Sequence, residues 1–132
     1  MTRDVAKPNC AMQPEIRRII AVEAHRRRTG RCPVRVHSLG TGETFDIQPA
    51  DRGFFDVTSG LNVRVSEEQI LVPSLGAKID LSLEGDVGFV GYDHMDGEPF
   101  SGRAGGGASV TLYDRGQSNF FQYAVAAEGE PI

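Results

Sequence analysis

Residues 14–31 read PEIRRIIAVEAHRRRTGR, and this stretch sets how the fold begins. Four of its apolar side chains recur with the 3.6-residue period of an α-helix: Ile16, Ile19, Ile20 and Ala24. Pro14 suits the first helical turn, where its missing N–H is not needed, and Gly30 suits a left-handed cap. The three arginines at 26–28 complement the negative end of the helix dipole. The pattern predicts an amphipathic helix over residues 14–28.

Beyond Cys32 the period of the apolar residues changes to two. Residues 79–84 read IDLSLE, in which apolar and polar side chains alternate as in a half-buried strand. The same pattern predicts further strands around residues 34–36, 45–47, 53–57, 63–65, 86–93, 98–103, 108–114 and 119–125. Turn-forming residues separate these segments at 40–42, 59–60, 84–85, 96–97 and 114–116.

This order of elements predicts a mainly β fold. No second helix separates the strands, which excludes a parallel sheet because its crossover helices are missing. We expect an antiparallel barrel or sandwich of about eight short strands, preceded by one N-terminal amphipathic helix. The chain of 132 residues is expected to form one β-rich domain over residues 14–132, after a flexible tail at residues 1–13.

The first residues and the cysteines suggest where the protein works. Residues 1–4 read MTRD with no apolar segment behind them, and no apolar run approaches the roughly 18 residues of a membrane span. These features predict a soluble, bacterial-type cytoplasmic protein without a signal peptide or membrane span. Reduced thiols are then favoured for Cys10 and Cys32, although a disulfide between them stays an alternative.

Charge divides the chain at about residue 36. Residues 1–36 contain nine basic and three acidic residues, a net charge of +6, whereas the remainder contains five basic and 15 acidic residues, a net charge of −10. This asymmetry indicates either an anionic partner for the basic segment or docking of the two parts onto each other. The acidic sheet disfavours binding of DNA or RNA.

Candidate catalytic and metal-binding patterns are weak. The three histidines and two cysteines show no metal-ligand spacing, and no nucleophile motif lies near His94. Residues 93–98, DHMDGE, resemble a polar hairpin tip more than a calcium loop, and residues 102–109 lack the helix that follows a phosphate-binding loop. Phe120 and Phe121 face opposite sides of a strand, so one of them belongs to the core. We expect neither an enzyme nor a cofactor.

The densest basic cluster, residues 26–31, reads RRRTGR. Guanidinium groups bind phosphates through paired hydrogen bonds, so four of them around a glycine turn could hold a phosphodiester. The alternative is a helix end whose arginines complement the dipole and solvate the surface.

The cluster also carries a resemblance to a known family. Arg27 and Arg31 form an Arg-x-x-x-Arg pair, and residues 56–65, DVTSGLNVRV, resemble the Asp-x-Ser-x-x-Gly turn and following strand of PilZ domains. These are small β-barrels that bind cyclic di-GMP. The resemblance implies that Arg27, Arg28 and Arg31 contact phosphates and guanine faces, and that Asp56 and Thr58 contact a guanine edge beside Gly60. The glycine falls one residue earlier than in the family, and Thr58 replaces its serine.

Two functions follow as hypotheses. In the first, the protein is a non-enzymatic binding or assembly module that docks on a protein partner or on itself through the N-terminal helix or the sheet surface. In the second, it is a PilZ-like receptor for a phosphorylated ligand such as cyclic di-GMP. They differ in whether the arginines and the turn at Asp56 converge on one site.

Overall fold

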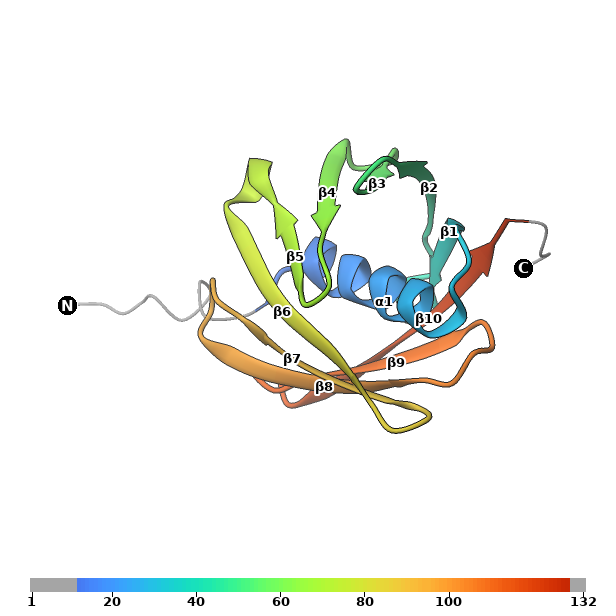
Figure 1. Ribbon diagram of the computed structural model, residues 1–132. Helices are drawn as coiled ribbons and strands as arrows, with labels where there is room; N and C mark the ends of the chain where they lie inside the picture. Colours follow the sequence, from blue (N-terminus) through green and yellow to red (C-terminus); the bar gives the residue numbers. More distant parts are fainter. Residues whose placement is uncertain (1–11, 129–132) are drawn as a thin grey trace.

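The computed structural model describes residues 12–128, which form one helix, one short 3-10 turn and ten strands. The helix α1 spans Pro14–Thr29, and the 3-10 turn η2 spans Pro73–Leu75. The strands are β1 Pro33–Ser38, β2 Thr44–Ala50, β3 Gly53–Asp56, β4 Leu61–Val65, β5 Gln69–Val72, β6 Ala77–Glu84, β7 Gly88–Asp93, β8 Glu98–Ala104, β9 Ser109–Asp114 and β10 Asn119–Ala127. Each strand pairs with the next in antiparallel fashion, and β10 pairs with β1 to close the barrel (Figure 1).

The helix lies inside the barrel. In Figure 1, α1 crosses the interior with strands on both sides of it, and every helix residue from Ile16 to His25 is buried. A barrel of this strand number encloses more space than its own side chains fill. The helix supplies that filling, so its side chains and those of the strands form one continuous core.

Two features of the predicted helix are corrected. It begins at Pro14 as predicted and runs to Thr29, one residue beyond the predicted end, and Gly30 forms the expected left-handed cap. The apolar stripe is buried as predicted, but the opposite face is not exposed to solvent. Its polar side chains are buried as well: Arg17, Arg18, Glu23 and His25. An amphipathic helix packed beside a sheet would keep one face in water, whereas this helix is enclosed by the strands.

The closed barrel settles the choice between barrel and sandwich. The predicted strands are present, but the barrel has ten strands where about eight were expected. The segment that was missed is β5, a four-residue strand between the acidic loop at 66–68 and Pro73. Its inward residues Ile70 and Val72 are fully buried, yet two apolar residues are too few for a clear alternating pattern.

Two glycines allow β7 and β8 to approach each other under aromatic rings. Gly91 pairs with Phe100, and Phe89 pairs with Gly102. A Cβ atom added at either glycine would lie 2.2–2.3 Å from the ring opposite. The two rings meet edge to face, with centroids 6.4 Å apart. Each ring therefore covers the backbone of a glycine on the next strand, which fixes the register of this hairpin.

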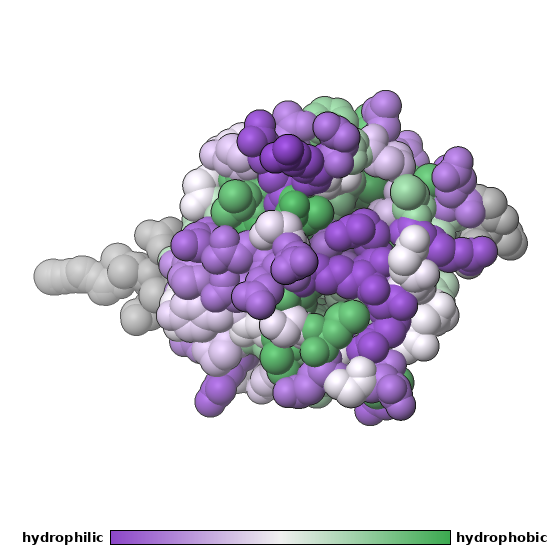
Figure 2. Space-filling view, in the orientation of Figure 1, coloured by the Kyte–Doolittle hydropathy of each residue, from purple (hydrophilic) through white to green (hydrophobic). Residues whose placement is uncertain are grey.

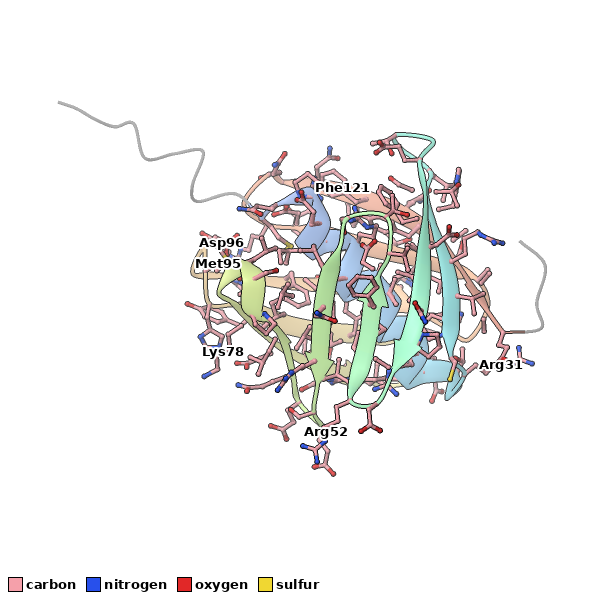
Figure 3. The ribbon with its side chains drawn as sticks, turned by 90° about the horizontal axis from the view of Figure 1, so that it is seen from above. Arg31, Arg52, Lys78, Met95, Asp96 and Phe121 are labelled. Carbon is pink, nitrogen blue, oxygen red and sulfur yellow. The ribbon has the colours of Figure 1, made fainter. Side chains whose placement is uncertain are left out.

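The barrel has two different ends, because the loops of an up-and-down barrel alternate between them. The entry end, where α1 begins, carries the loops at 39–43, 57–60, 73–76, 94–97 and 115–118. The exit end, where α1 finishes, carries those at 51–52, 66–68, 85–87 and 105–108. Figure 3 shows Phe121, Met95 and Asp96 toward the start of the helix, and Arg31 and Arg52 at the opposite end.

The face seen in Figure 2 carries mainly hydrophilic side chains, with apolar ones in small separate groups. Within residues 12–128 there is no helix of the length and apolarity that a membrane crossing requires. Met12, which the sequence placed in a flexible tail, is buried. Cys32 is exposed, and its predicted relation to Cys10 lies outside the described residues.

The buried isoleucines generate a prediction about stability. Ile19 is fully buried between the helix and the barrel wall. Ile19→Ala should therefore lower the free energy of unfolding by about 2–5 kcal/mol, through lost burial and the cavity left behind. Urea unfolding followed by circular dichroism measures this loss. The control is Leu71→Ala, whose side chain is 39% exposed and whose loss should stay below about 0.5 kcal/mol. Equal losses in the two variants would contradict the packing of α1.

Candidate functional site

At the exit end, the arginine cluster bonds to the barrel itself. The buried Glu23 accepts hydrogen bonds from Arg26 Nε at 2.8 Å and from Arg27 Nε at 2.7 Å. Arg27 also donates to the carbonyl oxygens of Ser66 and Leu81. Arg28 donates to three further carbonyl oxygens, at 2.8–2.9 Å, which belong to Gly85, Gly88 and Ala104. These bonds supply donors to main-chain oxygens where the strands end.

The structure separates the residues that the PilZ resemblance assigned to one site. Asp56, Thr58 and Gly60 lie in and beside one turn at the entry end, where Gly60 N donates to Asp56 O and Thr58 Oγ1 accepts from Asp46 N. Arg27, Arg28 and Arg31 lie at the exit end.

The partner of Asp56 is a helix residue that the resemblance did not include. Asp56 bonds to Arg18, which precedes Arg27 by nine residues or roughly 13 Å along the helix axis. The structure therefore does not unite the turn with the arginine cluster. Binding of cyclic di-GMP stays a prediction.

Two buried ion pairs join the start of α1 to the barrel wall. Arg17 Nη1 lies 3.1 Å from Asp114 Oδ2, and Arg18 Nη2 lies 2.8 Å from Asp56 Oδ2. The side chains of all four residues are at most 8% exposed. These pairs dock the basic N-terminal segment onto the acidic remainder of the chain, which is one of the two possibilities that the charge asymmetry indicated. Because isolated buried charges are costly, these pairs fix the rotation of α1 within the barrel.

The aspartates of these pairs belong to a recurring turn. Asp56, Asp93 and Asp114 each end a strand, follow an aromatic residue or pair of residues, and point inward. In each case one carboxylate oxygen accepts a turn N–H: from Ser59 at 3.2 Å, from Met95 at 2.9 Å and from Gln117 at 3.4 Å. The turn N–H groups thereby help to orient these carboxylates, of which Asp56 and Asp114 also meet an arginine of the helix.

Aromatic rings hold the other side of both guanidinium groups. Arg17 Cζ lies 3.9 Å from the ring centre of Phe121, and Arg18 Cζ lies 3.6 Å from that of Phe45. Arg17 also donates to Met12 O at 2.8 Å. Cation–π contacts of this kind strengthen when water is excluded. Each guanidinium group is therefore held at an edge by a carboxylate and at a face by a ring.

Above these groups lies a hollow of about 520 Å³ at the entry end, here called the entry hollow. It opens between the β1–β2 loop, the first half of β10 and the first turn of α1. It is lined by Pro14, Arg17, Arg18, Ser38, Leu39, Gly40, Thr41, Glu43, Phe45, Asn119, Phe120, Phe121, Gln122 and Tyr123. Leu39 and Phe120 are 53% and 64% exposed, and the Phe120 ring rests against Tyr113 at 4.8 Å between centres. The hollow thus has a polar floor and an apolar rim.

A second group of carboxylates lies elsewhere at the entry end. Burial raises the pKa of Asp93. Burial, followed by repulsion from Asp93, raises the pKa of Asp96 from 3.8 to about 6. Asp96 Oδ2 is buried and has no hydrogen-bond partner in the described part of the chain. Among residues 12–128, no group of three or more His, Cys, Asp and Glu side chains is arranged to hold a metal ion.

Sequence reasoning missed the residues that matter most at this end. Arg17 and Arg18 lie on the face opposite the isoleucine stripe, where charged residues are ordinary for an amphipathic helix, so no local signal marks that face as enclosed. The prediction that Phe120 and Phe121 face opposite sides of a strand, one of them toward the core, is confirmed, since Phe120 is exposed and Phe121 packs against the core.

Comparison with known proteins identifies no relative of this chain. Neither protein-family models, nor curated proteins, nor solved structures give a match.

The buried ion pairs generate a prediction about stability. Arg18→Met removes the partner of the buried Asp56 and should cost about 3–5 kcal/mol of unfolding free energy, because it leaves an uncompensated charge. Adding Asp56→Asn should recover part of that loss. The control is Arg35→Met, whose pair with Asp46 is exposed and should contribute less than about 1 kcal/mol. Chemical denaturation of the wild type and the three variants measures these differences, and equal costs for Arg18→Met and Arg35→Met would refute the buried pairing.

The raised pKa of Asp96 generates a prediction about pH. Because the folded protein binds this proton more tightly than the unfolded chain, the contribution of Asp96 to stability falls as pH rises from 3.8 to about 6. Burial lowers the pKa of His25, which gives the opposite slope in its own range. Asp96→Asn should therefore remove only the first effect and stabilise the protein relative to wild type at about pH 7.5. Thermal unfolding across this range checks the difference, and parallel curves for variant and wild type would contradict it.

Proposed function

We propose that the protein is a non-enzymatic binding module whose recognition surface is the entry hollow. The observation that carries this proposal is the combination of two exposed apolar side chains, Leu39 and Phe120, with two buried guanidinium groups in one concave site. Pockets of a few hundred Å³ with an apolar lining and few fixed polar groups are typical of small-molecule sites.

The exposed apolar rim supports binding at this end. Leu39 lies in the β1–β2 loop and Phe120 near the start of β10, and both line the hollow. Large apolar side chains in water at the edge of a hollow commonly mark an interaction site. The Phe120 ring packs against Tyr113 of β9, and both Phe120 and Leu39 remain exposed and available to a ligand in the folded protein.

The composition of the lining favours binding over catalysis. None of the described residues that line the hollow is a histidine, cysteine or lysine. These are the side chains that most often act as bases or nucleophiles near neutral pH. Ser38 and Thr41 also line the hollow, and the carboxylate beside them, Glu43, is exposed. The lining therefore offers a ligand apolar contacts and charged groups.

The other predicted docking surfaces are less favourable. Because α1 is enclosed, its apolar stripe is not accessible to a partner. On the outside of the sheet, Leu71 of β5 and Tyr92 of β7 are separated by β6, where Lys78 pairs with Leu71 and Asp80 pairs with Tyr92. These side chains are therefore scattered among charges and form no continuous apolar patch.

Nile red, a neutral apolar dye, tests the proposal. The wild-type protein should bind the dye saturably, and the double variant Leu39→Ser/Phe120→Ser should bind it at least tenfold more weakly, because both rim contacts are lost. Both positions are exposed, so the fold should survive, which urea unfolding verifies. The matched control Leu71→Ser lies outside the hollow and should bind like wild type.

Two results would count against the entry hollow. One is the absence of saturable dye binding, and the other is equal affinity in the rim variant and the control. Cyclic di-GMP belongs in the same set of titrations. If its binding is lost in Arg27→Ala and kept in the rim variant, the recognition surface lies at the exit end instead.

A further inference from the structure

We infer that the entry hollow selects an amphipathic anion, a free small molecule with one carboxylate, sulfonate or phosphate group on an aromatic or other apolar body. This inference rests on the proposed function and adds the chemical class of the ligand. It comes from the way charge and aromatic surface are arranged around the hollow.

The charges that face the hollow are mainly positive. Arg17 and Arg18 line it, whereas their partners Asp114 and Asp56 are not among its lining residues. The carboxylates hold the guanidinium groups in place and leave these cations as the charged floor of the site. Glu43, the acidic residue of the lining, is exposed. A ligand in the hollow therefore meets the two cations more closely than the two buried anions.

The start of α1 adds to the positive potential. Pro14, the first helical residue, lines the hollow, and Gln13 provides no side-chain cap to the first turn. The N-terminal end of a 16-residue helix carries a partial positive charge that favours anions, and Glu15 in the first turn offsets part of it. In addition, Arg17 Nε is buried and has no hydrogen-bond partner in the described part of the chain. Because this atom is closed to solvent, the charge of the guanidinium group, and not a hydrogen bond from Nε, would attract an anion in the hollow.

The aromatic groups explain why the ligand also needs an apolar body. Phe45 and Phe121 stack on the guanidinium groups and line the hollow, and Leu39 and Phe120 form its rim. A ligand whose anionic group reaches the floor would place its remaining atoms between these side chains. Inorganic phosphate has no apolar body and would not make that contact. A cationic ligand would be repelled by the arginines.

A matched series of naphthalene derivatives tests the inference on the wild-type protein. Isothermal titration calorimetry compares 2-naphthoate, the neutral 2-naphthamide, the cationic 2-naphthylmethylamine and inorganic phosphate. We expect 2-naphthoate to bind at least tenfold more tightly than 2-naphthamide, and the amine and phosphate to bind more weakly than both. A ratio below about threefold between naphthoate and naphthamide would overturn the inference, since charge-assisted hydrogen bonds contribute more than that.

A paired variant separates charge from shape. Arg17→Gln/Asp114→Asn removes a cation together with its buried partner, so no unpaired charge remains. It should keep the affinity for 2-naphthamide and lose most of the preference for 2-naphthoate. Arg35→Gln, at an exposed ion pair outside the hollow, should keep that preference. If the paired variant folds and retains the full preference, the cations do not select the ligand.

The two proposals fail in different ways. If Nile red binds at the rim but naphthoate shows no advantage over naphthamide, the hollow is a binding site without charge selection, and only this inference falls. If neither the dye nor any naphthalene derivative binds, the proposed function falls as well.

Discussion

The structure depends on enclosing a charged helix inside a closed barrel. An enclosed helix has no face in water, so each of its polar side chains needs a partner within the protein. Arg17 and Arg18 find theirs in Asp114 and Asp56, and Glu23 finds its partners in the arginines that follow it. The ten strands need the helix in turn, because their own side chains do not fill the interior. The helix therefore fills the barrel, and the barrel supplies the partners of its buried charges.

The same constraint gives the two ends of the barrel different properties. At the exit end, Arg27 and Arg28 donate to main-chain oxygens of five loops and strands, so these cations tie the helix end to the barrel. At the entry end, Arg17 and Arg18 are held from behind by carboxylates and from the side by rings. Those two cations are rigid and border a hollow. Fixed charge beside apolar surface is the basis of selective binding.

Much of the fold was predictable because it depends on patterns among residues that are close in the sequence. The isoleucine stripe, Pro14 and Gly30 placed the helix almost to the residue, and the alternation in residues 79–84 identified a strand. Turn chemistry at Gly60, Gly85 and Gly97 placed the loops, and all three glycines have the positive φ that such turns require. The short strand β5 was missed because Ile70 and Val72 alone give too weak a period.

The sequence by itself determined one helix, a run of short antiparallel strands and a basic segment joined to an acidic body, because these depend on neighbours in the chain. Only the tertiary structure decided that the helix lies inside the barrel and which arginine meets which aspartate. The Arg17–Asp114 contact joins residues 97 positions apart, and no local period encodes it. Barrel closure brings them together, since it fixes where each strand end lies around the helix. The entry hollow is therefore a product of the fold.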